Sequence, residues 1–277
     1  MSTSAIKKVS AAAIVAVLGI SGVSHAAQLP YNTKFSTSTP DAQSQTYTAG
    51  TLEGQNGWKD ETGDPTNVAA VNSGGGVTLS AAPAAGAYSD VYDSNIADHA
   101  GTDLNPATYG NFININYTMN ITAPTGSQSI ASVTNPESAA SFGVDVLGSD
   151  DSLLASVYTV ANPAHAGEED VVIDGGTPSQ KTDPILAPPG NGTSSTYSID
   201  MNFTNDTFTV FAGGVQGGTY SFTPAAGGIG GIALGTDNGG TDKAVYSAFQ
   251  VVPEPASLAM VGLGGLVLMA RRPKRTV

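Results

Sequence analysis

The stretch from residue 112 to residue 121 constrains the fold more than any other part of this 277-residue chain. It reads Phe-Ile-Asn-Ile-Asn-Tyr-Thr-Met-Asn-Ile, with apolar residues at the odd positions and polar residues at the even positions from Asn114 on. Successive side chains of a β-strand point to opposite faces of its sheet. The pattern therefore predicts a strand with one face in a core and the other in water.

Further strands are expected at residues 142–146, 153–160, 171–173, 197–204, 208–211 and 244–251. Asn205 and Asp206 stand between two of them and tolerate the left-handed backbone of a hairpin turn. No window of ten or more residues between Ala27 and Val252 has the 3.6-residue period of a helix.

Glycine-rich or proline-rich segments at 73–76, 183–193 and 227–240 are expected to connect the strands. Many short strands and no helices predict an all-β fold, an antiparallel β-sandwich. Because no linker interrupts the strands, we expect one domain over residues 27–251.

Composition excludes several function classes. The chain has no cysteine, which rules out thiolate zinc sites, cysteine nucleophiles and haem attachment. Outside the two ends, the cations are Lys34, Lys59, Lys181 and Lys243, against all of the 23 acidic residues except Glu254. Such a surface repels phosphates, so we expect no nucleic-acid partner.

The C-terminal end has three parts in a fixed order. Pro253, Glu254 and Pro255 come first, and an uncharged apolar run fills residues 256–270. The run is shorter than the roughly 20 residues of an ordinary spanning helix, so it predicts a marginal transmembrane helix. The basic residues behind it are expected on the cytoplasmic side of the inner membrane; they are Arg271, Arg272, Lys274 and Arg275.

The N-terminal end has the order of a secretory signal peptide. Lys7 and Lys8 precede an apolar run over residues 9–23, and Ser24-His25-Ala26 offers small residues at the positions that a signal peptidase reads. We expect a signal helix over residues 1–26 and cleavage between Ala26 and Ala27. Both ends therefore predict that the domain between them is exported.

The C-terminal order resembles the PEP-CTERM sorting signal of Gram-negative and related bacteria. That family has a Pro-Glu-Pro motif, a short membrane helix and a terminal basic cluster, and an exosortase processes it. The resemblance covers residues 252–277 and implies an inner-membrane-anchored precursor that then reaches the cell surface or extracellular matrix.

A second resemblance starts near the N-terminus of the expected domain. Residues 47–58, Tyr-Thr-Ala-Gly-Thr-Leu-Glu-Gly-Gln-Asn-Gly-Trp, look like the opening of concanavalin A/laminin-G-like jelly rolls. The resemblance implies a lectin-like sandwich in which residues 68–71 pair with residues 77–79. It also implies that the first and last strands lie side by side.

Two kinds of binding site remain open. Trp58, with Gln55 and Asn56 beside it, offers a possible aromatic platform for a sugar; the alternative is that the ring packs in the core. Carboxylates crowd residues 90–103 and suit calcium, although no calcium-loop motif is present and ordinary acidic loops are the alternative; these are Asp90, Asp93, Asp98 and Asp103. We otherwise expect no cofactor.

Catalytic signatures are weak. His99 and His165 lie in polar loops, away from any Gly-x-Ser-x-Gly elbow. No strand carries the Glu-x-Asp-x-Glu of jelly-roll glycosidases, and Asp145 and Asp200 should point away from the core. We expect a structural or adhesive matrix protein that is not an enzyme. The alternatives are a carbohydrate-binding module that recognises exopolysaccharide and, more distantly, a hydrolase.

Overall fold

The computed structural model describes residues 31–41, 44–60, 69–80, 90–95, 104–122, 141–162, 168–174, 181–187, 193–237 and 243–253. They fall within one compact unit, Leu29–Glu254. The predicted signal peptide, with Ala26 and Ala27, lies outside the described residues, as do the predicted membrane helix and the basic cluster. Among the described residues, no helix combines the length and apolar character needed to cross a bilayer.

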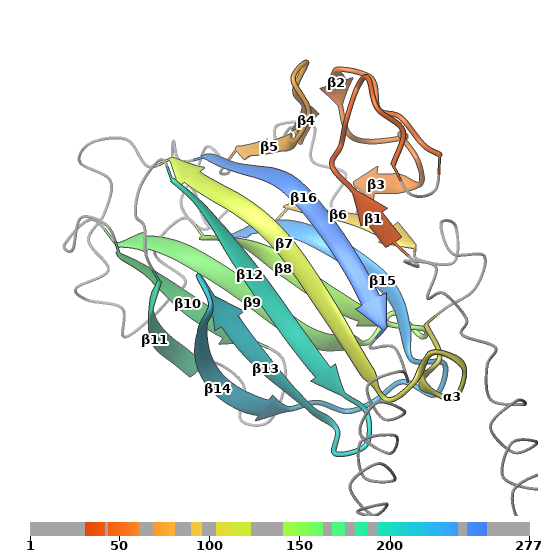
Figure 1. Ribbon diagram of the computed structural model, residues 1–277, viewed down its shortest axis with the longest axis vertical. Coiled ribbons are helices and arrows are strands. Elements are labelled where there is room, and N and C mark those ends of the chain that lie inside the picture. The colour runs from red at the N-terminus through yellow and green to blue at the C-terminus, as the bar shows by residue number, and fades with distance from the viewer. Residues whose placement is uncertain are drawn as a thin grey trace, which may run out of the picture. The chain divides into compact units, whose positions relative to one another are not determined.

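Two antiparallel sheets form the fold, and Figure 1 shows them stacked, with β7, β12 and β16 in the front layer. The nine-stranded sheet has the order β14 (Val215–Ser221), β13 (Thr207–Ala212), β12 (Ser194–Asn202), β7 (Phe112–Thr122), β16 (Lys243–Pro253), β5 (Val77–Ser80), β4 (Ala70–Val71) and β2 (Gly50–Thr51). β1 (Tyr31–Thr33) also pairs with β16. The seven-stranded sheet has the order β11 (Lys181–Ala187), β10 (Glu168–Asp174), β9 (Leu153–Asn162), β8 (Ser141–Gly148), β15 (Ile229–Asp237), β6 (Asp90–Asn95) and β3 (Trp58–Asp60).

The core lies between the inner faces of the two sheets, as the alternation predicts. In β7, every residue from Ile113 to Ile121 at an odd position is buried, and every even one is half-buried. Tyr246 crosses the core, where its hydroxyl donates a hydrogen bond of 2.8 Å to the carbonyl oxygen of Gly143 in the other sheet. The prediction of an all-β antiparallel sandwich is confirmed.

Three local predictions are also confirmed. β12 and β13 form the expected hairpin, and Asp206 in its turn has a φ of 53°. β4 pairs with β5, and the first described strand, β1, lies beside the last, β16. The register of β1 and β16 joins Tyr31 to Val251.

The expected connection at residues 227–240 is wrong, because β15 lies there, in the middle of its sheet between β8 and β6. One of its glycines, Gly235, makes room for an aromatic ring. Gly235 pairs with Gly143, which pairs with Tyr158, and a Cβ on Gly235 would collide with the Tyr158 hydroxyl. Glycine in this strand therefore marks a close approach and not a turn.

Two smaller expectations also need correction. β11 occupies residues 183–187 of the expected connection at 183–193, and Pro184 is tolerated there because β11 is an edge strand. A one-turn helix, α3 (Pro106–Tyr109), begins after Asn105, whose side-chain oxygen accepts the backbone N–H of Ala107. A single turn is too short to produce a helical period in the sequence.

Candidate functional site

A row of polar side chains crosses the outer face of the nine-stranded sheet. The strand registers place Asn32 of β1 opposite Gln250 of β16, Gln250 opposite Asn116 of β7, and Asn116 opposite Ser198 of β12. All four side chains are half-buried and stand on the face that turns away from the core. We call these four residues the amide row. Phe211 of β13, also half-buried, continues the row beyond Ser198.

Hydrogen bonds join the amide row to the next row along the strands. Gln250 donates to the side-chain oxygen of Asn32 at 3.3 Å, and Asn116 donates to that of Asn114. The Asn114 amide then donates both to Ser198, at 2.9 Å, and to Asp200. The network ends at the carboxylate of Asp200. An ionised carboxylate accepts hydrogen bonds but cannot donate them.

The network leaves hydrogen-bonding capacity on the outer surface. An amide group has two donor hydrogens and one acceptor oxygen. Within the part of the chain that the structure describes, one hydrogen and the oxygen of Asn116 have no protein partner, and the same is true of Gln250. Donors and acceptors side by side on a fixed surface suit sugar hydroxyls, which both donate and accept.

Buried aromatic side chains on the inner face of the sheet hold the amide row in position. Each member of the amide row is the chain neighbour of a buried aromatic residue on the inner face; these residues are Tyr31, Phe249, Tyr117 and Tyr197. Their rings are in contact, with centroids 5.7 Å apart from Tyr31 to Phe249, 6.4 Å from Phe249 to Tyr117 and 5.0 Å from Tyr117 to Tyr197. The packing of these four rings therefore holds the backbone of the amide row rigidly.

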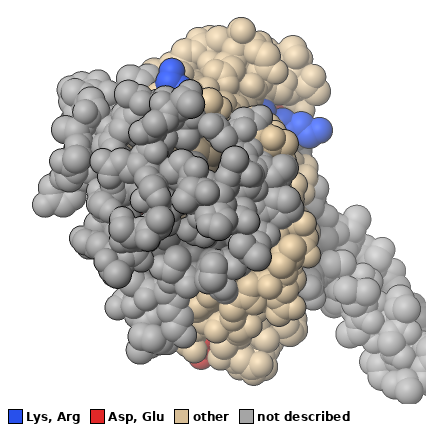
Figure 2. All heavy atoms as spheres, turned by 90° about the vertical axis from the view of Figure 1, so that its left-hand side faces the viewer, with Lys and Arg blue, Asp and Glu red and all other residues tan. Residues whose placement is uncertain are grey.

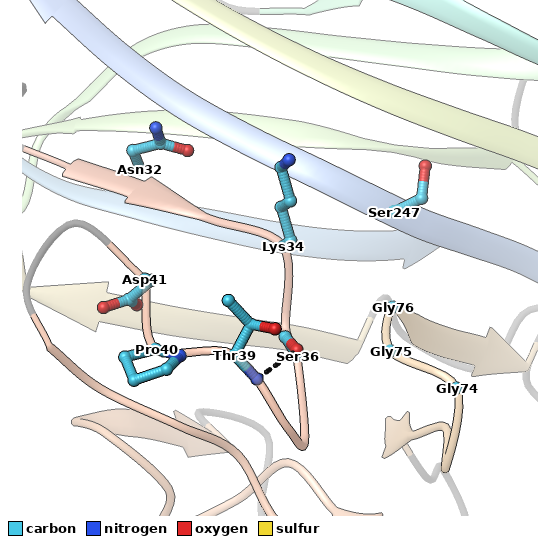
Figure 3. A pocket seen from close by; sticks show the side chains of 10 residues that line it. All are labelled: Asn32, Lys34, Ser36, Thr39, Pro40, Asp41, Gly74, Gly75, Gly76 and Ser247. Atoms are coloured by element: carbon cyan, nitrogen blue, oxygen red, sulfur yellow. Dashed lines mark hydrogen bonds between the residues drawn. The ribbon is translucent and has the colours of Figure 1, made fainter.

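A hollow of about 640 Å³ opens next to the Asn32 end of the amide row (Figure 3). β16 pairs on this side with β5 as far as Tyr246 and with β1 from Phe249 onward. Ser247 lies in the gap, at a bulge that adds one residue to β16 between the partners of Met119 and Thr118. β-bulges redirect side chains, and this one leaves Ser247 exposed in the lining of the hollow.

The glycine turn that closes the hollow is tightly built. Gly76 has a φ of +83°, and a Cβ there would lie 2.9 Å from the carbonyl oxygen of Tyr246. Its N–H donates to the carbonyl oxygen of Lys34 at 3.2 Å, which joins the two walls of the hollow. Gly74, in contrast, has open space around it.

The opposite wall depends on an unusual backbone conformation. Phe35 is fully buried and has a φ of 51°, which is rare for a bulky residue. Its ring packs against Tyr47 and Trp58, with centroid distances of 5.3 and 5.8 Å, and its N–H donates to Thr33 Oγ1 at 3.0 Å. These contacts hold Phe35 inside the core while its neighbours Lys34 and Ser36 line the hollow.

The predicted sugar platform lies in this part of the molecule, but its tryptophan faces inward. Trp58 is 0% exposed, and its indole N–H donates to the Tyr47 hydroxyl at 3.2 Å. The side-chain oxygen of Gln55 accepts the N–H of Thr48, and its side-chain nitrogen donates to the carbonyl oxygen of Thr48. Asn56 donates to the carbonyl oxygen of Thr46. In this structure the three residues brace one loop against the core.

The structure brings few of the predicted metal and catalytic residues together. Asp90 and Asp93 lie on β6, whereas Asp98, Asp103, His99 and His165 lie outside the described residues. The described residues contain no group of three or more His, Asp or Glu that could hold a metal ion.

Asp145 and Asp200 both turn away from the core, but they belong to different sheets. Asp145 stands on β8, where its Oδ2 accepts the Tyr158 hydroxyl at 3.1 Å. Asp200 stands on β12, in the amide network. Packed sheets lie about 10 Å apart and each carboxylate is on an outer face, so the two do not flank a common bond.

Sequence reasoning identified the outward positions of β7 but not their role. Asparagine is depleted in strands, so the presence of Asn114, Asn116 and Asn120 on one face was a usable signal. Gln250, Asn32 and Lys34 gave no such signal, because only the pairing of β1 with β16 brings them to the same place.

Known structures resemble the chain only distantly. Lectin II from Ulex europaeus is 11% identical, with a TM-score of 0.45, over 73% of this chain and 95% of the lectin. An alginate lyase from Pseudomonas aeruginosa is 13% identical, with a TM-score of 0.44, over 65% of this chain and 83% of the lyase. A sialidase is 8% identical, with a TM-score of 0.49, over 72% of this chain but only 17% of the sialidase. TM-scores below 0.5 carry no argument about activity.

Sequence comparison adds one specific finding. No curated protein matches the chain. Residues 251–275 match the family model of the PEP-CTERM protein-sorting motif. The C-terminus of this chain therefore carries a PEP-CTERM sorting motif, and residues 251–253 of that motif are also the last residues of β16.

Proposed function

We propose that this protein is exported, sorted to the cell surface by its PEP-CTERM motif, and attached there to glycan through the amide row. Its role is structural or adhesive, in the surface layer or extracellular matrix, and it is not catalytic. Exosortase is the processing partner that the motif implies.

The observation that carries the binding proposal is the unfilled hydrogen-bonding capacity of Asn116 and Gln250 on a rigid face. Sites for polar ligands combine a preformed surface with a few fixed donors and acceptors. Phe211, at the far end of the row, adds a half-buried aromatic edge, a group that commonly contacts the apolar face of a ligand.

The separation of Asp145 and Asp200 supports a non-catalytic role. Glycoside hydrolysis by the common mechanism needs two carboxyl groups on either side of the same bond. Among the described residues of the amide row and of the adjacent row of Asn114, Asp200 is the only one with a carboxylate, so these two rows offer one such group.

A glycan array tests the binding proposal. The protein is expected to bind a subset of bacterial polysaccharides, and Asn116→Ala should weaken that binding about tenfold, the effect of one or two lost hydrogen bonds. Asn120→Ala is the matched control, since it makes the same change on the same face of β7 outside the row. Equal losses from the two variants, or no binding by the wild type, would contradict the proposal.

Intact-mass analysis of the protein recovered from its host tests the sorting proposal. Val251 is fully buried and pairs with Tyr31, so cleavage within β16 would require opening of the folded body. We therefore expect a mature C-terminus at or beyond Pro253. A chain that ends before Val251, or one that keeps its full tail at the cell surface, would show that processing differs from this proposal.

A further inference from the structure

The hollow at the end of the amide row has a chemistry of its own. It is lined by an amide, an ammonium group, hydroxyls, one carboxylate and a glycine turn. Its volume of about 640 Å³ falls within the usual range of small-ligand pockets, which is roughly 300–1,000 Å³. Asn32 belongs both to its lining and to the amide row, so the two are continuous.

The two charged groups of the hollow differ in their surroundings. Asp41 is tied into its own turn, where its Oδ1 accepts the N–H of Gln45 at 2.8 Å and its carbonyl oxygen accepts the N–H of Ser44. The Lys34 ammonium forms no ion pair with the residues that the structure describes, and its side chain is exposed. The cation is therefore available to a ligand.

Two other polar side chains lie on the same side of the hollow as that cation. Figure 3 shows the side chains of Asn32, Lys34 and Ser247 on the β16 side of the hollow, with Asp41 on the other side. An ammonium and a hydroxyl group that line one hollow can together donate to an anionic group. Figure 2 shows lysine atoms only in separate spots on the described surface of its view.

We infer that this hollow is a subsite for a negatively charged sugar unit, with a carboxylate group on Lys34 and Ser247. The inference rests on the proposed function: a glycan that lies along the amide row ends in the hollow with its acidic unit. The acidic body repels polyanions at long range, but charges separated by more than about 10 Å are largely screened at 0.1 M salt. The contact with Lys34 is local, and it selects for acidic glycans that the neutral amide row alone would not distinguish.

Matched pairs of glycans test this inference. The probes are oligomers of galacturonate, glucuronate, mannuronate and guluronate, each beside its carboxyl-reduced neutral form, with affinity measured by isothermal titration calorimetry. We expect the wild type to prefer at least one acidic form over its neutral form by about tenfold, which corresponds to one charge-assisted hydrogen bond. Lys34→Met should remove this preference without weakening binding of the neutral form, and Lys34→Arg should keep most of it.

Two more variants test whether the preference comes from net charge and whether it depends on the hollow. Lys59→Gln removes a charge from β3, in the other sheet, and should leave the preference intact. Gly74→Leu fills the hollow at a position with open space and an unstrained backbone, and should remove the preference while the protein stays folded.

The outcomes separate this inference from the proposed function. A wild type that binds neutral glycans without preference for any acidic form overturns the inference and leaves the proposed function standing. Loss of preference in Lys59→Gln as large as in Lys34→Met shows a net-charge effect and also overturns it. Dextran sulfate distinguishes the source of the charge, because tighter binding of sulfate esters than of all carboxylates refutes a carboxylate subsite.

Discussion

The two faces of β7, β12 and β16 use neighbouring residues for opposite purposes. On the inner face, Tyr117, Tyr197 and Phe249 are at most 1% exposed and their rings pack against one another. On the outer face, the adjacent Asn116, Ser198 and Gln250 form the amide row. One face supplies packing energy, and the other supplies hydrogen-bonding groups that the fold does not use up.

This difference shows that the packing of the inner face sets where the side chains of the outer face lie. Because strand side chains alternate with a period of two, a slip of one residue would move every amide into the core and every aromatic ring into water. The contacts among the tyrosine and phenylalanine rings therefore fix the register, and the register alone places Asn32, Gln250, Asn116 and Ser198 in one line.

The largest expected effect comes from breaking the inner face. Tyr197→Ala removes a fully buried ring that stacks on Tyr117, and it should lower the free energy of unfolding by about 3–5 kcal/mol, as other large aromatic truncations do. Urea denaturation measures this change. Ser198→Ala, at the next residue on the outer face, is the control, and a loss below about 1 kcal/mol at Tyr197 would refute the division between the faces.

Alkaline pH should weaken the inner face. Burial raises the pKa of Tyr246 well above its ordinary value of 10.0, and burial, followed by the neighbouring Tyr47, does the same for Tyr31. Both tyrosines are neutral in the folded state, so their stabilising effect is complete below pH 10 and is lost as the pH rises above it. The loss should approach about 1.4 kcal/mol per pH unit for each group.

Urea denaturation between pH 8 and pH 11 checks this prediction. Tyr246→Phe should make the decline above pH 10 less steep, although it also removes the hydrogen bond to the Gly143 carbonyl oxygen and so lowers stability at neutral pH. A flat profile up to pH 11 in the wild type would mean that neither phenol is held neutral by the fold.

The alternation in the sequence was enough to predict which face each side chain of β7 occupies. It was also enough to predict the hairpin at Asp206, because this turn depends on local pattern and turn chemistry. The pairing of β4 with β5 and the neighbourhood of the first and last strands came instead from the resemblance of residues 47–58 to lectin-like jelly rolls.

The amide row and the hollow depend on contacts that the sequence does not state. Asn32 and Gln250 are 218 residues apart, and only a long-range register joins them. The left-handed Phe35 opposes local preference and is held by the aromatic side chains of Tyr47 and Trp58. β15 escaped prediction because its glycines resemble those of a loop, although one of them, Gly235, is required by the ring of Tyr158.

The smallest expected effect on the free energy of unfolding concerns the outer face. It allows the two faces to be compared at adjacent residues of β12. Asp200→Asn removes a charge but keeps a side-chain oxygen that can accept from Asn114 and Ser198. Asp200 is half-buried and points away from the core, so the free energy of unfolding should change by no more than about 0.5 kcal/mol. Met201→Ala, one residue along β12 on the inner face, should instead cost about 2–5 kcal/mol. If Asp200→Asn destabilised the protein as much as Met201→Ala, the amide network would be part of what holds the sandwich together, and its outer surface would have no capacity to spare for a ligand.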